Sequence, residues 1–249
     1  LCKEKEVPYY IVGNGSNLLV SDKGYDGVII HLFKNMSAMR IEGNKVYVQA
    51  GALLSKVAVQ AGRKGLTGME FASGIPGTIG GALVMNAGAY GGEMKDVVRL
   101  VQVMCEDGSF REYTGAEMEF GYRTSRVLHE KSVALEAVLE LTPGDSTAIQ
   151  NRMEELKEAR TTKQPLNYAS AGSTFKRPEG YFAGKLIQDA GLSGFSVGDA
   201  QVSEKHCGFV INRGEATAAD VAELIRKVQE QVYEKFQVKL EPEVRMLGF

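Results

Sequence analysis

Apolar and polar positions alternate along this chain in two periods, one typical of strands and one typical of helices. Strands are predicted at residues 9–12, 17–20, 27–32, 39–41, 45–49, 97–105, 133–141, 173–176, 208–212 and 243–246. Helices are predicted at residues 53–64, 145–160, 182–190 and 217–236. Gly43-Asn44 lies between two of the strands and indicates a hairpin, and Thr217 followed by Asp220 is typical of a helix start.

Pro143-Gly144 is the clearest break in the second half of this pattern. With 249 residues, the chain is long enough for two modest domains that each bury a core. We therefore predict a boundary between residues 142 and 143, which divides the chain into domains 1–142 and 143–249. The alternating elements predict a mixed fold of the α+β or α/β class.

Residues 71–92, FASGIPGTIGGALVMNAGAYGG, contain no Asp, Glu, Lys or Arg, and seven of them are glycine. The run is too short and too rich in glycine to span a membrane. Bare backbone costs conformational entropy, and it is commonly found where main-chain N–H groups approach a phosphate-bearing cofactor. The alternative is a loop packed tightly against a core.

Gly13-Asn14-Gly15-Ser16-Asn17 is a second glycine motif that follows a predicted strand. It lacks the third glycine of a dinucleotide-binding fingerprint and the Lys of a P-loop. Two interpretations remain open, a tight turn between strands and a group of amides that binds a pyrophosphate. Two such loops in one half of the chain favour a dinucleotide that lies across both.

The composition is that of an ordinary globular protein, with 44% hydrophobic residues, 24% charged residues and a net charge of −2. This balance gives no basic surplus for nucleic acid or anionic lipid, and no apolar run is as long as a membrane helix. Three cysteines without CxxC spacing and three scattered histidines predict neither disulfides nor a metal site. The chain opens without Met and reaches a strand within a few residues, so we expect that it lacks the first elements of its domain.

Five motifs follow one another in a characteristic order, namely GNGSNLLVSD, SGIPGTIGGALVMNAGAYGGE, GYRTSR, AGSTFKRP and LEPEVRMLG. In this the chain closely resembles the UDP-N-acetylenolpyruvoylglucosamine reductase family, in its shorter subtype (type II), over essentially its whole length. The resemblance implies an FAD-binding domain of the vanillyl-alcohol-oxidase type, followed by a smaller α/β substrate-binding domain. Members of the family carry a further N-terminal segment ahead of the first strand seen here.

The resemblance implies non-covalently bound FAD, with NADPH as co-substrate. The expected FAD-binding residues are Gly13, Asn14, Gly15, Ser16, Asn17, Gly74, Ile75, Pro76, Gly77, Thr78, Gly80, Gly81, Asn86, Ala87, Gly88 and Tyr90. Of these, the two glycine loops are expected to bind the pyrophosphate through amides, and residues 86–90 are expected to line the flavin. An uncharged lining would also keep water away from hydride transfer.

The implied reaction reduces the enolpyruvyl group of UDP-N-acetylglucosamine enolpyruvate to give UDP-N-acetylmuramate, a precursor of peptidoglycan. The resemblance assigns Ser173 as the acid that protonates C2, and Arg123 and Glu243 as stabilisers of the developing charge. Taken alone, Ser173 could equally be a turn hydroxyl, and Arg123 could stack on Tyr122 at the surface. The strand period does not distinguish Glu243 from Glu241, whereas the family pattern selects Glu243.

By resemblance, the expected substrate-binding residues are Tyr122, Lys163, Arg177, Arg160 and Arg245. Arginine forks suit phosphate oxygens, although Arg160 could instead interact with a helix C-terminus. We expect a cytoplasmic monomer that acts on a small molecule and binds neither nucleic acid, membrane nor metal. Two alternatives stay open, a sugar or alcohol oxidase of the same flavoprotein superfamily and a non-catalytic FAD- or nucleotide-binding remnant.

Overall fold

The computed structural model describes all 249 residues, which form two compact units. The first unit comprises Leu1–Gly15 and Val28–Arg160, and the second comprises Ser16–Gly27 and Thr161–Phe249. The chain thus contributes a short N-terminal segment to the second unit before it returns to the first. No helix is both long and apolar enough to cross a membrane.

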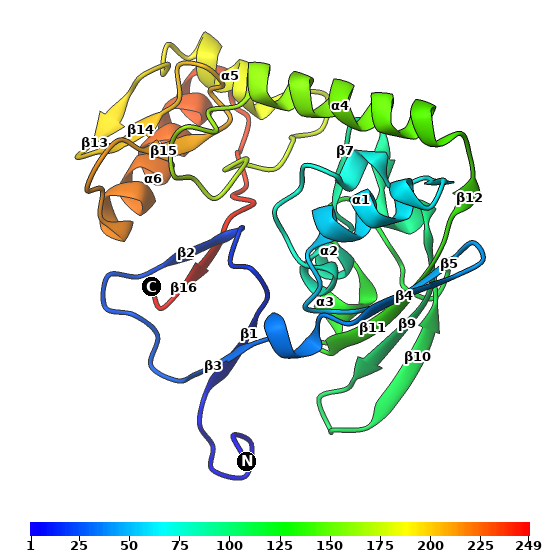
Figure 1. Cartoon of the computed structure of the whole chain (residues 1–249). Coiled ribbons are helices and arrows are strands. Elements are labelled where there is room, and N and C mark those ends of the chain that lie inside the picture. The colour runs from blue at the N-terminus through cyan, green and yellow to red at the C-terminus, as the bar shows by residue number, and fades with distance from the viewer. The chain divides into compact units, whose positions relative to one another are not determined.

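The first unit is built on a five-stranded antiparallel sheet with the strand order β10-β9-β11-β5-β4 (Figure 1). Its strands are β4 (Met39–Glu42), β5 (Lys45–Gln49), β9 (Val98–Met104), β10 (Phe110–Thr114) and β11 (Val133–Glu140). Alternate residues such as Val46, Val48, Val101 and Val103 are fully buried, because successive side chains of a strand point to opposite faces. The predicted hairpin at Gly43-Asn44 is confirmed as β4 and β5.

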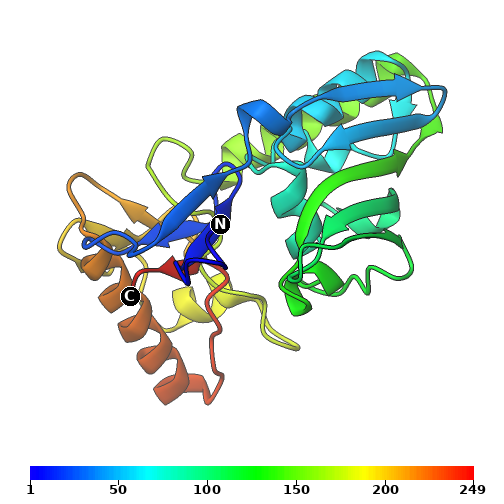
Figure 2. The same ribbon diagram turned by 90° about the horizontal axis from the view of Figure 1, so that it is seen from below.

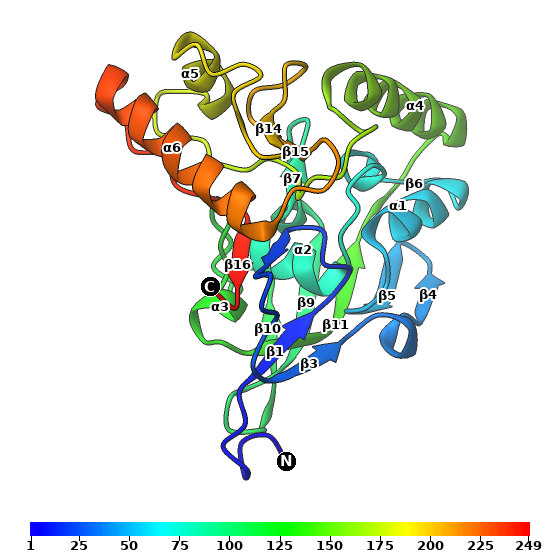
Figure 3. The same cartoon turned by 90° about the vertical axis from the view of Figure 1, so that its left-hand side faces the viewer.

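Short strand pairs complete the first unit. They are the parallel pair β1 (Tyr9–Val12) and β3 (Val28–His31), and the antiparallel pairs β6 (Leu66–Thr67) with β12 (Thr142–Pro143) and β7 (Gly88–Ala89) with β8 (Gly92–Glu93). Figure 3 shows β1 and β3 side by side.

The helices of the first unit are α1 (Leu54–Arg63), α2 (Ile79–Met85), α3 (Arg126–His129) and α4 (Ser146–Lys163), with 3-10 turns η1 (Lys34–Met36), η2 (Glu70–Ala72) and η3 (Met94–Asp96). Helix α1 buries Leu54, Val57, Ala58 and Ala61, which share one face at helical spacing. Helices α1 and α2 lie on one face of the sheet (Figure 2).

Helix α4 belongs to the first unit up to Arg160 and its last three residues to the second, whereas the sequence predicted a boundary in front of the helix at residues 142/143. The reason is packing, since Ile149 and Met153 belong to the core of the first unit. A side chain on Gly62 of α1 would lie 2.9 Å from Met153 Cε, so the two helices approach closely there. Whether the substrate-binding part begins at residue 143 is not tested by this division, so that boundary stays a prediction.

The second unit combines two small sheets with two helices. Its elements are β2 (Leu18–Val20), α5 (Ala183–Asp189), β13 (Ser196–Val197), β14 (Ala200–Val202), β15 (Val210–Asn212), α6 (Ala218–Phe236) and β16 (Arg245–Leu247). Strand β2 pairs in parallel with β16, and β13, β14 and β15 form an antiparallel sheet against which α6 packs (Figures 1 and 3).

The start of α6 explains how the N-terminal segment is held in the second unit. Thr217 and Asp220 form the capping box that the sequence indicated. The carboxylate of Asp22 also accepts hydrogen bonds from the amides of Ala218 and Ala219, at 2.7 and 2.9 Å. The first amides of a helix have no partner within the helix, so this contact fastens residues 16–27 to α6.

Two predicted elements differ from the structure. Residues 173–176 make only isolated bridges, Ser173 with Phe209 and Phe175 with Pro242, so successive residues pair with two different segments and no ladder forms. No helix was predicted within the glycine run, yet it contains helix α2 (Ile79–Met85). Thr78 begins this helix as its N-cap, which the surrounding glycines obscured in the sequence.

Candidate active site

The two glycine loops expected to bind FAD touch each other within the first unit. Asn14 Nδ2 donates to the carbonyl oxygen of Pro76 at 2.6 Å. A Cβ on Gly13 would lie 2.2 Å from Thr78 Oγ1, so only glycine permits this approach. Gly15 has a φ of +67°, which also favours glycine. The backbone of residues 13–15 in the first glycine motif therefore lies against that of residues 76–78 in the second. We refer to this contact as the strip of backbone.

Several amides in the second glycine loop already have protein partners. Gly80 N donates to Ala50 O at 2.8 Å, and Gly81 N donates to Thr78 Oγ1 at 3.4 Å. Gly80 packs closely, since a Cβ there would lie 3.1 Å from Ala50 Cβ. These two amides therefore serve the packing and capping of helix α2.

One arginine lies against this uncharged backbone. Arg160, near the end of α4, packs so closely on Gly74 that a Cβ on the glycine would lie 2.8 Å from Arg160 Nε. Burial lowers the pKa of the Arg160 guanidinium, while nearby Tyr90 acts in the opposite sense. The strip of amides, the bare Gly74 and a partly buried cation fit a dinucleotide that carries two phosphates.

Asn86, Ala87, Gly88 and Tyr90 follow α2 directly. Ala87 accepts a hydrogen bond from Met94, and Gly88 begins the β7–β8 hairpin. Tyr90 lies at the hairpin tip with a φ of +52° and is exposed. Asn86 is 1% exposed and its side chain is directed at protein groups, so contact with a flavin from this residue would involve its backbone.

Arg123 lies in the first unit, in a tight turn closed by reciprocal hydrogen bonds between Gly121 and Thr124. Its φ is +56°, in the left-handed region that a non-glycine residue seldom adopts. Its guanidinium carbon lies 5.2 Å from the centroid of the Tyr122 ring, so the stacking considered from the sequence is present. Such backbone strain persists where the surroundings hold it, and it is enriched at functional sites.

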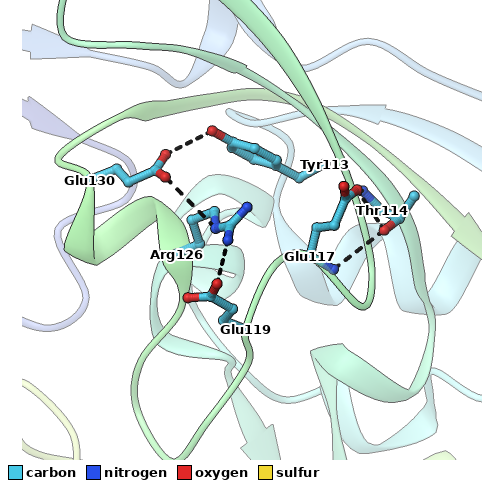
Figure 4. A network of polar contacts seen from close by, with 6 residues as sticks. All are labelled: Tyr113, Thr114, Glu117, Glu119, Arg126 and Glu130. Atoms are coloured by element: carbon cyan, nitrogen blue, oxygen red, sulfur yellow. Dashed lines mark hydrogen bonds and ion pairs between the residues drawn. The ribbon is translucent and has the colours of Figure 1, made fainter.

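A polar network supports the segment that carries this turn (Figure 4). Tyr113 Oη donates to Glu130 at 2.8 Å, and this bond to a carboxylate raises the pKa of Tyr113. Arg126 pairs with Glu119 and Glu130 and lies 5.0 Å from the Tyr113 ring centroid. The network ties β10 to both ends of residues 119–130.

Ser173 and Glu243 come together in the second unit through the residue between them, Thr174. The Glu243 amide donates to Thr174 O at 2.8 Å, and the Thr174 amide donates to Gly208 O at 2.8 Å. Thr174 is 5% exposed, and its hydroxyl accepts from the Val210 amide at 2.9 Å. Ser173 is therefore an exposed residue on a backbone that is fastened on two sides.

The structure distinguishes Glu241 from Glu243, which the strand period alone did not. Glu241 is exposed and forms an ion pair with Lys176. Glu243 is half-buried, and its carbonyl accepts from Asn17 Nδ2 at 3.1 Å. The sequence did not predict that Thr174 fastens the backbone beside Ser173, or that the side chain of Asn17 binds the carbonyl of Glu243. The only signal for either role in the sequence is that both residues are polar.

The expected substrate-binding residues fall into both units. Tyr122 and Arg160 lie in the first unit, and Lys163, Arg177 and Arg245 lie in the second. Arg177 is held in place, with Nε donating to Tyr181 O at 3.3 Å and the guanidinium 3.9 Å from the centroid of the Phe182 ring. Arg245 begins β16, and its amide donates to Asn17 O at 3.0 Å.

Comparison with known proteins matches both halves of the chain to described families. The family described as an FAD binding domain matches residues 1–114. The family described as the C-terminal domain of UDP-N-acetylenolpyruvoylglucosamine reductase matches residues 164–247.

Whole-chain relatives agree with these matches. The UDP-N-acetylenolpyruvoylglucosamine reductases of Clostridioides difficile (strain 630) and Alkaliphilus oremlandii (strain OhILAs) are each 54% identical over 248 residues, which span 100% of this chain and 82% of those proteins. The crystal structure of UDP-N-acetylenolpyruvylglucosamine reductase from Thermus caldophilus is similar with a TM-score of 0.85 and 39% identity, over 98% of this chain and 87% of that one. The predicted order of an FAD-binding domain and a reductase C-terminal domain is confirmed.

Proposed function

Because the chain belongs to the UDP-N-acetylenolpyruvoylglucosamine reductase family, we infer that it reduces the enolpyruvyl group of UDP-N-acetylglucosamine enolpyruvate with NADPH as electron donor. The chain is an FAD-dependent oxidoreductase of peptidoglycan precursor synthesis. Identity of 54% over its full length is the observation that carries this conclusion.

Bound FAD supplies the hydride that reaches C3 of the enolpyruvyl group, after taking it from NADPH. We propose that the strip of backbone formed by Gly13–Gly15 and Gly74–Thr78 holds the pyrophosphate through its amides. The support is the contact between Gly13 and Thr78, since a Cβ at position 13 would close the approach. Arg160 adds a cation beside Gly74, and Tyr90 extends from the hairpin that follows.

We propose that Ser173 donates the proton that C2 receives when C3 receives hydride. Serine is a weak acid, but the carbon that it would protonate becomes strongly basic as hydride arrives. The support from the structure is positional, since Thr174 fastens the backbone beside Ser173 to Gly208 and to Glu243. A proton donor that is held rigidly in the reactive orientation lowers the entropic part of the activation barrier.

We propose that Arg123 and Glu243 stabilise the negative charge that spreads from C2 into the substrate carboxylate. A fixed guanidinium does this directly. An ionised carboxylate would repel that charge, so the proposed contribution of Glu243 is that of a hydrogen-bond donor. The left-handed backbone of Arg123 supports the assignment, since strain of this kind is concentrated at functional sites.

We propose that Tyr122, Lys163, Arg177 and Arg245 bind the nucleotide sugar, and that residues 143–249 are the substrate-binding part. We also propose that the enzyme acts as a cytoplasmic monomer and binds no nucleic acid, in keeping with a net charge of −2. Light scattering of the purified protein tests the monomer, and a dimer mass at working concentration would contradict it.

The activity is tested on the purified chain reconstituted with FAD. NADPH oxidation should depend on the enolpyruvyl substrate, and the product should be heavier by two hydrogens. Acid precipitation should release the flavin into the supernatant as FAD. Rapid oxygen consumption with free sugars would favour an oxidase instead, and a chain that binds FAD but shows no NADPH oxidation dependent on the enolpyruvyl substrate would favour a non-catalytic remnant.

A further inference from the structure

Asn86 is a buried polar residue whose side chain joins three separate pieces of backbone in the first unit. It is the C-cap of α2, with φ 42° and ψ 56°, and it is 1% exposed. Its Nδ2 donates to the carboxylate of Glu93 and to the carbonyl of Gly121, the latter at 3.1 Å. Its Oδ1 accepts from the Lys95 amide at 2.9 Å. Both donors of the amide are therefore used by protein groups.

Gly121 is the first residue of the turn that carries Arg123. Its carbonyl also accepts from the Thr124 amide, at 3.4 Å, so the same oxygen closes the turn and binds Asn86. Within the turn, the Gly121 amide also donates to the Thr124 carbonyl at 3.1 Å, so Asn86 adds a bond from outside to a turn that is closed by two of its own. A carbonyl oxygen has two lone pairs, and these two donors satisfy both.

The turn has one other fastening to the end of α2. Ser125 is fully buried, and its hydroxyl donates to the carbonyl of Val84 at 3.0 Å. Asn86 and Ser125 thus hold the two ends of the turn against the last residues of one helix. Between them the backbone of Arg123 keeps its left-handed conformation, which costs free energy and persists only where the surrounding contacts hold it.

We propose that Asn86 is a positioning residue for the reductase reaction, whose side-chain amide fixes the Gly121–Thr124 turn and thereby the direction of the Arg123 guanidinium. The proposal rests on the role that Proposed function gives to Arg123. The residue sits in the same uncharged run as the flavin-lining positions, so the run serves the reaction in two ways. Its backbone is near the cofactor site, and one of its side chains orients a residue that acts on the substrate.

Asn86→Gly tests this, because glycine keeps the left-handed C-cap while removing the side chain. We expect kcat to fall on the order of tenfold or more, since misplacing a stabilising group is costly. FAD content and the rate of flavin reduction by NADPH should be unchanged. Hydrogen exchange of the Thr124 amide should become faster, which reports the turn without any turnover.

Asn44→Gly is the matched control. Asn44 Nδ2 also donates to a distant carbonyl, that of Leu141 at 3.2 Å, but at the β4–β5 turn. The control should lose stability to a similar extent and retain kcat. If both variants lower kcat alike, the effect of Asn86 is general destabilisation and the proposal is overturned.

A double-mutant cycle with Arg123→Ala separates the proposal from the function on which it rests. If Asn86 acts through Arg123, adding Asn86→Gly to Arg123→Ala should change kcat by less than about twofold. Full additivity would overturn the role of Asn86 and leave that of Arg123 intact. An Arg123→Ala enzyme with wild-type kcat would instead refute the role of Arg123.

A second variant covers the case in which Asn86→Gly does not fold. Asn86→Asp keeps the acceptor for the Lys95 amide, but a carboxyl beside Glu93 donates at most one hydrogen bond, when protonated, so the bond to Gly121 is lost and kcat should again fall selectively. If neither variant retains FAD, Asn86 is part of the framework of the cofactor site and the proposal is wrong.

Discussion

The side-chain amide of Asn17 donates a hydrogen bond to the backbone carbonyl of Glu243 at 3.1 Å. The two residues are 226 positions apart in the sequence, and the carbonyl of Asn17 also accepts from the Arg245 amide at 3.0 Å. The last residue of the first glycine motif therefore clamps the segment that presents Glu243. Its side chain serves the second unit, although the motif suggested a contact with the cofactor.

Asn17→Ala should consequently affect turnover more than cofactor binding. The variant loses a bond worth about 1 kcal/mol of stability, and Glu243 loses its clamp. We expect kcat to fall on the order of tenfold while the dissociation constant of FAD changes little. The measurement is FAD titration alongside steady-state turnover. Weakened FAD binding with normal turnover at saturating FAD would return Asn17 to the cofactor site.

Arg123→Ala should lower kcat and kcat/KM together, because the charge on which Arg123 acts exists mainly in the transition state. The expected loss is on the order of 10²–10³-fold. Lysine keeps the positive charge but lacks the planar guanidinium that donates two parallel hydrogen bonds. Arg123→Lys should therefore retain more activity than Arg123→Ala and less than the wild type. A rise in KM alone would reassign Arg123 to ground-state binding of the substrate.

Glu243 is tested by comparing two substitutions. Glu243→Ala should lose activity to a similar extent as Arg123→Ala, whereas Glu243→Gln, which still donates a hydrogen bond, should retain more. Steady-state kinetics of the two variants make the comparison. Equal loss in both would contradict the role of Glu243 as a hydrogen-bond donor.

Gly13→Ala should weaken FAD binding, because its Cβ would lie 2.2 Å from Thr78 Oγ1 and force the two glycine loops apart. Gly108→Ala is the control. Gly108 has a φ of +86° in the β9–β10 turn with nothing within 4 Å of a Cβ, so this variant suffers backbone strain alone. Fluorescence titration with FAD should give a higher dissociation constant for Gly13→Ala than for Gly108→Ala. Equal affinities would show that the contact between the loops is not needed for the cofactor.

His206 predicts a pH dependence of stability. Burial lowers its pKa in the folded state, and its Nδ1 accepts from the Gly208 amide at 3.1 Å, which favours the neutral ring. As pH falls below the unfolded value of about 6.5, the unfolded chain binds a proton that the folded chain resists, so stability falls. His206→Asn keeps an acceptor at the Nδ1 position and should flatten the acid side of a plot of unfolding free energy against pH. An unchanged plot would contradict this.

Local patterns predicted most of the larger elements. Helix α1 follows from one apolar face, α6 from its capping box, and the β4–β5 hairpin from Gly43-Asn44. Helix α2 was missed because glycine disfavours helices in isolation, and here tertiary packing against Ala50 overrides that preference. The strand expected at residues 173–176 was wrong in form, because strand pairing depends on partners that the local sequence does not contain.

The residues of the candidate site were found by their motifs, but their supports were not. Asn17 and Asn86 both lie within glycine motifs, and the family resemblance assigns them to the cofactor, which stays a prediction. Their side-chain amides donate hydrogen bonds to the carbonyls of Glu243 and Gly121, over 226 and 35 positions. Hydrogen bonds between side chains and backbone groups so far apart in the sequence produce no regular pattern of residues. They can therefore be identified only from a structure.

Ser173→Ala tests the account most directly, because the proposed role of Ser173 begins only after the flavin has been reduced. The flavin absorbance is followed by rapid mixing, with NADPH added first and the enolpyruvyl substrate second. The account predicts a normal first phase and a stalled reoxidation, with partial recovery in Ser173→Cys, whose thiol also donates a proton. Reoxidation of the alanine variant at the wild-type rate would contradict it, and Ser173 would then be only a turn residue.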